Sequence, residues 1–99
     1  MIRHTVAFKL KHPAGSPSER DFLQAAQRLA TLPGIKNFEC LRQTGKKNNY
    51  DFGLSMEFGS VKDYQAYNEH PDHVRFVQTR WLLEVIDFVE IDYEPMKEG

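Results

Sequence analysis

The residues best suited to chemistry in this sequence are histidines and tyrosines. His4 is the one polar member of an otherwise apolar alternating pattern, and Tyr67 and His73 stand on either side of His70–Pro71. Imidazole has a pKa of about 6.5 and exchanges protons near neutral pH. A buried tyrosine hydroxyl can donate a hydrogen bond to a developing enolate oxygen. If His4, Tyr67 and His73 meet, they can carry out general acid–base chemistry. If they do not, His4 is a core histidine whose hydrogen bonds are satisfied internally.

His70 and His73 also form a His-x-x-His pair, with Glu69 and Asp72 beside it, which is a possible metal-binding pattern. A proline at position 71 prevents a regular helical pair at this spacing, and no further ligand cluster accompanies it. We therefore predict no metal, and we expect Glu69, His70 and Asp72 to face water or to cap the next helix. The sequence has no glycine-rich phosphate loop, no GxSxG and no CxxC motif, so no cofactor is expected.

Periodic patterns define the elements that must position these residues. Alternation of apolar and polar residues predicts four strands, over 2–10, 35–43, 50–58 and 85–93. Apolar residues at spacings of three and four predict helices over 17–32 and 61–70, capped by Ser16 and Ser60, and a further helix after Pro71. The inner sides of the first and last of these helices should carry Phe22, Ala25, Ala26, Leu29 and Leu32, and Val74, Phe76, Val77 and Trp81, respectively.

This β-α-β-β-α-β order predicts an α+β, ferredoxin-like fold, in which helices cover one face of a four-stranded antiparallel sheet. With 99 residues, the chain should form a single domain over 1–99, ending in a short irregular tail, "EPMKEG". The other face of the sheet carries the small residues Thr5, Ala7, Gly53 and Ser55, and no helix remains to cover it. We therefore expect a homodimer through this open sheet face.

Composition excludes several classes of partner. Thirteen basic and fourteen acidic residues give a formal net charge of −1, so no nucleic-acid or membrane-surface partner is expected. No apolar run approaches the roughly 20 residues that cross a bilayer, and the first residues do not resemble a signal peptide. Cys40 has no possible disulfide partner within the chain, which favours a cytoplasmic location and a role as a small core or interface residue.

Three segments, "HTVAFKLK", "SMEFGSVKDYQAYNEHPDHVRF" and "IDYE", resemble the stress-responsive A/B barrel domain (Dabb) family. The resemblance extends over nearly the whole chain. It implies a ferredoxin-like subunit and a homodimer whose sheets close into a dimeric α/β barrel. Most members of this family have no assigned function.

The set of histidines and tyrosine is also similar to that of a plant polyketide cyclase of the family, which needs no cofactor. That resemblance implies that His73 is a general base that takes a proton α to a carbonyl. It implies that Tyr67 hydrogen-bonds this histidine and the substrate oxygen, and that His4 lies in the pocket. A pocket tyrosine of the cyclase falls at or near Ala26, so a different substrate is expected. Phe22, Ala26 and Trp81 should line the pocket beside His4.

Three functions remain open from the sequence. The first is a cofactor-free acid–base enzyme or binder of a small aromatic or polyketide-like molecule. The second is a non-catalytic dimeric stress protein, with packed histidines and no cavity. The third is a cofactor-free monooxygenase using the same pocket, as in related dimeric α/β barrels that oxidise quinol-type substrates. A cavity of roughly a few hundred Å³ beside His73 would separate the first and third functions from the second.

Overall fold

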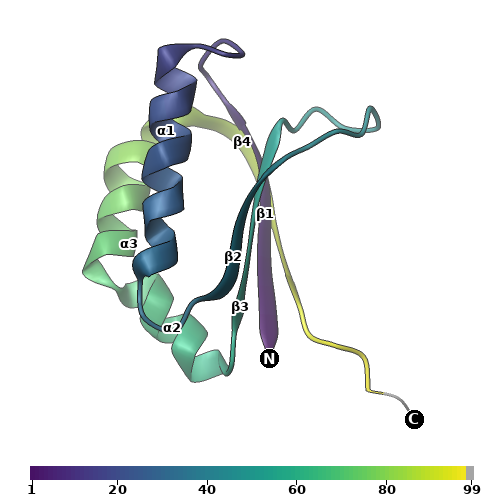
Figure 1. The fold of residues 1–99 in the computed structure, drawn as a ribbon, viewed down its shortest axis with the longest axis vertical. Coiled ribbons are helices and arrows are strands. Elements are labelled where there is room, and N and C mark those ends of the chain that lie inside the picture. Colours follow the sequence, from purple (N-terminus) through teal and green to yellow (C-terminus); the bar gives the residue numbers. More distant parts are fainter. Residues whose placement is uncertain (98–99) are drawn as a thin grey trace.

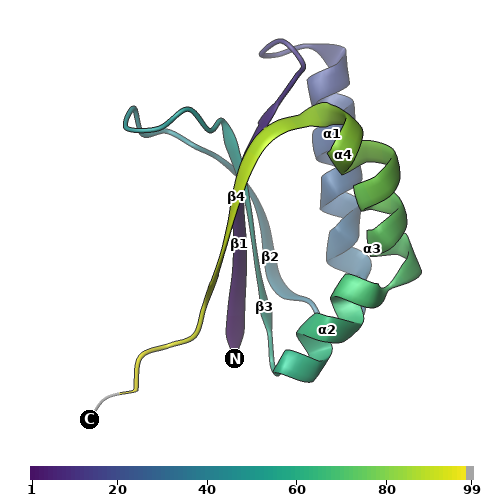
Figure 2. The same cartoon turned by 180° about the vertical axis from the view of Figure 1, so that it is seen from behind.

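The computed structural model describes residues 1–97. It contains one antiparallel sheet with helices on one of its faces (Figure 1). The strands are β1 (Ile2–Leu10), β2 (Lys36–Arg42), β3 (Phe52–Phe58) and β4 (Val85–Tyr93), in the spatial order β2-β3-β1-β4. The helices are α1 (Pro17–Gln27), η1 (Arg28–Thr31), α2 (Val61–Glu69), α3 (Pro71–Phe76), η2 (Val77–Trp81) and α4 (Leu82–Glu84). Both views show α1, α2 and α3 on the same side of the sheet (Figures 1 and 2). The predicted ferredoxin-like fold is confirmed.

The alternating pattern of the central strands places their apolar side chains under the helices. In β1 and β3, every second residue is buried, and the two strands pair so that Val6 faces Leu54 and Phe8 faces Phe52. Because side chains alternate across a strand, His4 shares this inner face with Val6 and Phe8. It is one of two buried polar residues among those described. The sheet thus presents an imidazole to the helices.

The helix α1 begins where the sequence predicts and ends earlier. The Ser16 hydroxyl accepts a hydrogen bond from the Glu19 backbone N–H at 3.2 Å, and Pro17 occupies the first turn. After Gln27 the chain tightens into the 3₁₀ helix η1, so the predicted continuous helix over 17–32 is wrong in its last turn. Leu32 has extended backbone angles because it precedes a proline, and 3₁₀ turns are common where α-helices end.

The second helical region breaks at His70, as predicted, and then changes its hydrogen-bond pattern. His70 is extended, with φ −60° and ψ 133°, and its Nδ1 accepts from the Asp72 N–H at 3.1 Å, which caps α3. A π-helical turn, η2, follows α3 and leads to the buried Trp81. The predicted inner position of Val74 is wrong. The inner side follows His73, Phe76 and Val77, so Val74 points outward and is 37% exposed.

The outer face of the sheet is uncovered and carries apolar side chains. Pairing aligns Leu41, Gly53, Ala7 and Val89 in one row across all four strands. Glu39, Ser55, Thr5 and Ile91 form the adjacent row. Every residue of β4 after Val85 is exposed. The small residues at the centre of these rows lie between longer exposed side chains, which are aliphatic except for Glu39.

The remaining predictions concern the boundaries and the tail. The second and third strands are one or two residues shorter than predicted at their ends. Residues 94–97 have no regular structure, as expected, and the last two residues of the predicted tail lie outside the described part of the chain. Within residues 1–97, none of the helices has the length and apolar composition that a membrane crossing requires.

Candidate functional site

A cavity of about 170 Å³ lies between the helices and the inner face of the sheet. Its walls are mostly apolar, from the residues Val6, Leu29, Leu54, Met56, Phe76, Val77, Trp81, Leu82 and Phe88. Five polar residues border it: His4, Tyr67, Asn68, His73 and Glu90. Leu82, Phe88 and Glu90 are exposed residues, so the cavity meets solvent where α4 passes into β4. An apolar enclosure with a few polar groups is typical of small-molecule sites.

The structure brings together four of the six residues that the sequence predicts for the site. His4, Tyr67, His73 and Trp81 all border the cavity. Phe22 and Ala26 do not: both are fully buried in the core behind it. The Phe22 ring packs against Phe8, Phe76 and Trp81, with centroid distances of 5.9, 5.6 and 6.2 Å. These aromatic rings fill the space beneath α1, so α1 supports the cavity wall without forming it.

His73 is held by the broken end of α2. Its Nδ1 lies 3.2 Å from the backbone oxygen of Asn68, one of the last carbonyls of the helix, which have no partner within the helix itself. A carbonyl oxygen only accepts, so Nδ1 carries the proton and the neutral ring has its lone pair on Nε2. Burial lowers the pKa of His73, against the opposing effect of the Asn68 hydrogen bond. His73 is therefore neutral at neutral pH and able to accept a proton.

Tyr67 lies beside His73, with ring centroids 4.3 Å apart, and packs on Phe58 at 5.2 Å. Its side chain is buried, yet its hydroxyl has no hydrogen-bond partner among residues 1–97. Every side-chain nitrogen or oxygen atom in that part of the chain that is itself buried has a partner. The hydroxyl oxygen of Tyr67 is therefore not fully buried, and the open space that Tyr67 borders is the cavity. Burial raises the pKa of Tyr67, which keeps the phenol protonated and able to donate.

His4 has two partners that the sequence patterns did not reveal. Its Nδ1 lies 2.6 Å from Asp92 Oδ1 and 2.9 Å from the Tyr64 hydroxyl, which also donates to Asp92 Oδ2 at 2.9 Å. Tyr64 lies three residues before Tyr67 on α2, so the two share a helix face, and this spacing could have indicated that Tyr64 also faces the sheet. Asp92 reaches His4 only because β4 pairs with β1 in the register that aligns these two residues, and the predicted fold does not specify that register.

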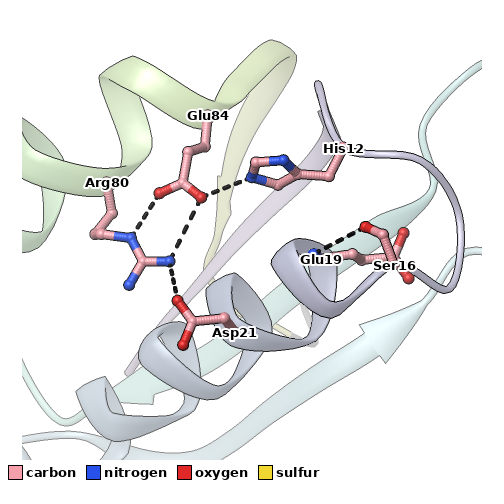
Figure 3. A network of polar contacts seen from close by, with 6 residues as sticks. All are labelled: His12, Ser16, Glu19, Asp21, Arg80 and Glu84. Atoms are coloured by element: carbon pink, nitrogen blue, oxygen red, sulfur yellow. Dashed lines mark hydrogen bonds and ion pairs between the residues drawn. The ribbon is translucent and has the colours of Figure 1, made fainter.

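Figure 3 shows a second polar cluster, and its members, His12, Asp21, Arg80 and Glu84, do not border the cavity. Arg80 binds Glu84 through Nε at 2.5 Å and Asp21 through Nη2 at 2.8 Å, and His12 Nε2 lies 2.7 Å from Glu84. Burial acts to raise the pKa of Glu84, but hydrogen bonds from Arg80 and His12 outweigh it, so the pKa is lowered. This cluster joins α1 to the helices that precede β4.

The alternative metal site is not assembled in residues 1–97, where no three His, Cys, Asp or Glu side chains are grouped to hold an ion. His70 Nδ1 is occupied by the cap of α3, and His73 Nδ1 by Asn68. The two rings therefore serve different parts of the broken helix.

Several proteins of known structure share this architecture. A crystal structure from Mesorhizobium loti, described as a Dabb family protein with a ferredoxin-like fold, is 50% identical, covers 97% of both chains and superposes with a TM-score of 0.96. A structure from Thermobifida fusca, described as a dimeric ferredoxin-like protein of unknown function, is 25% identical over 93% of this chain and 88% of its own, with a TM-score of 0.74.

A curated relative from Arabidopsis thaliana, described as a stress-response A/B barrel domain-containing protein, is 27% identical over 95 residues. That match covers 94% of this chain, which spans only 36% of the length of the relative. The family model for the stress responsive A/B barrel domain, Dabb, matches residues 2–95. The chain therefore belongs to the stress-responsive A/B barrel (Dabb) family.

Proposed function

We propose that this Dabb protein is a cofactor-free acid–base enzyme, or a binder, that acts on a small aromatic or polyketide-like molecule in the cavity between sheet and helices. The carrying observation is that the His73 imidazole and the Tyr67 hydroxyl, with ring centroids 4.3 Å apart, border one apolar cavity that His4 also borders. The cavity of about 170 Å³ is smaller than a drug-sized site, which favours a ligand built on a single ring.

The proposed chemistry is proton transfer at a carbon next to a carbonyl. The Nε2 lone pair of His73 takes the α-proton, and the C–H electron pair moves into the enolate. The Tyr67 hydroxyl donates a hydrogen bond to the oxygen on which charge develops. The imidazolium then returns its proton to the product. Burial supports both roles, since it keeps His73 neutral and Tyr67 protonated.

Exchange of hydrogen for deuterium in an activated ketone tests this function. In D₂O, the wild-type protein should accelerate exchange at the α-carbon of benzoylacetone, followed by NMR. His73→Ala should lose about 10²–10⁴-fold of the acceleration, which is the usual contribution of a general base. His70→Asn is the matched control, because asparagine retains the cap of α3. Equal acceleration by His73→Ala and wild type would exclude His73 as the base.

The competing functions are separable. A non-catalytic protein with packed histidines predicts a filled interior, whereas His4 and His73 border open space. A cofactor-free monooxygenase would use the same cavity, and oxygen uptake with hydroquinone as the probe distinguishes it. Uptake without α-proton exchange would favour the monooxygenase.

We further propose that two copies associate through the outer face of the sheet. The rows of mainly small and aliphatic side chains across β2, β3, β1 and β4 support this assembly, since no element of residues 1–97 covers them (Figure 2). A cytoplasmic location is also a proposal, supported by the free thiol of Cys40.

A further inference from the structure

Two residues from different elements form hydrogen bonds with one side of the His4 ring. Asp92 approaches from β4 and Tyr64 from α2, and both bind the same nitrogen, Nδ1. Tyr64 also binds Asp92 directly, so the three side chains form a closed triangle with edges of 2.6, 2.9 and 2.9 Å. This triangle is distinct from the His73–Tyr67 pair, although His4 borders the same cavity.

With Asp92 ionised, the chemistry of the carboxylate assigns the donors and acceptors in the triangle. An ionised carboxylate only accepts hydrogen bonds, so the proton between His4 and Asp92 belongs to Nδ1. The single hydroxyl proton of Tyr64 goes to Asp92 Oδ2, and its oxygen lone pairs face the Nδ1–H of His4. In the neutral ring, Nε2 must then carry the lone pair.

That lone pair faces the cavity. The His4 side chain is 8% exposed, and Nε2 forms no hydrogen bond within residues 1–97. Since no buried side-chain nitrogen or oxygen there lacks a partner, Nε2 must be in contact with open space, and the space that His4 borders is the cavity.

We propose that Asp92 and Tyr64 are positioning residues that fix the His4 ring, so that the neutral imidazole has its proton on Nδ1 and its Nε2 lone pair toward the cavity. Asp92 places the proton, and Tyr64 fixes the carboxylate. The site then has two acceptors, His4 and His73, and one donor, Tyr67.

This inference deepens the proposed function and rests on it where it concerns substrate. A ligand with no donor near His4 would bury the Nε2 acceptor without a hydrogen bond, and this would weaken binding. The site therefore selects molecules with a hydroxyl or N–H group at that point. The substrate class is therefore a small ring compound that carries at least one hydroxyl or amino group beside its reactive carbonyl.

The position of the proton can be read from the full chain without any substrate. In ¹⁵N-labelled protein, long-range ¹H–¹⁵N correlation spectra at a pH where His4 is neutral should show a protonated Nδ1 and a bare Nε2. In Asp92→Ala, Tyr64 becomes the remaining partner, and its hydroxyl donates to Nδ1. The proton should then move to Nε2 and the pattern should reverse. Asp87→Ala is the matched control, since Asp87 lies on β4 but on the outer face, opposite Lys9, and should leave the pattern unchanged.

Two results would overturn the inference: a wild-type spectrum with the proton on Nε2, or an Asp92→Ala spectrum identical to wild type. Tyr64→Phe provides an independent variant and should give partial loss of the Nδ1–H form, because the carboxylate is no longer fixed. No change there would remove Tyr64 from the proposal. Because these spectra need no turnover, a failed exchange assay with the expected tautomer would overturn the proposed function alone.

Discussion

At the scale of single residues, His4 and His73 reach the cavity in the same manner. Each has Nδ1 bound to an oxygen of the protein, Asp92 Oδ1 or the Asn68 carbonyl, and each residue borders the cavity. Hydrogen bonding at one ring nitrogen fixes the tautomer and hence the role of the other. The sequence supplied the two histidines, but the oxygens that orient them come from a helix end and from a paired strand.

The pKa of His73 should be measurably low, because burial disfavours its charged form. Its NMR titration midpoint should lie below that of the same chain unfolded in urea, which reports the ordinary value of about 6.5. Since the unfolded state binds the proton first, folding stability should fall as the pH drops below that value. A midpoint equal to or above that of the unfolded chain would contradict the burial argument.

At the scale of elements, local patterns were sufficient where local physics decides the structure. The alternation in β1 and β3, the caps at Ser16 and Ser60, and the break at His70 each depend on neighbouring residues, and each was predictable. The π turn of η2 and the register of β4 against β1 depend on packing between distant segments. Asp92 was therefore missed. Phe22 and Ala26 were wrongly placed at the cavity, because the resemblance to a family member does not reveal which residues of α1 are covered by neighbouring side chains.

The cap of α2 should make a measurable contribution to stability. The Ser60 hydroxyl accepts from the Asp63 N–H at 3.1 Å at the start of the helix that carries Tyr64 and Tyr67. Ser60→Ala should lower the free energy of unfolding by about 1 kcal/mol. Ser18→Ala is the control, since Ser18 is an exposed residue in the first turn of α1, and such changes usually stay within about 0.5 kcal/mol. Urea denaturation at one fixed protein concentration measures both, and equal effects would show that the cap is not the cause.

At the scale of the whole molecule, the two faces of the sheet differ in what they contact. The inner face carries the cavity, and the outer face presents aliphatic side chains to solvent in a single chain, among them Leu41, Val89 and Ile91, which are 44%, 38% and 44% exposed. Exposed aliphatic side chains on an uncovered sheet face are typical of an interaction site. Two copies can bring this same face together across a two-fold axis. The wild-type protein should therefore sediment as a dimer at micromolar concentration.

Val89→Lys tests the face itself, because a lysine in the middle of a buried interface lacks a partner for its charge. This variant should sediment as a folded monomer, since Val89 is already exposed in one chain. Val61→Lys makes the same substitution at a residue that is 59% exposed on α2, in the helical layer, and should remain dimeric. A monomeric wild type would refute the assembly, and a dimeric Val89→Lys would move the interface to another face. If the Val89→Lys monomer retains the exchange activity, the cavity is complete within one chain, and dimerisation and chemistry are independent properties of the two faces of one sheet.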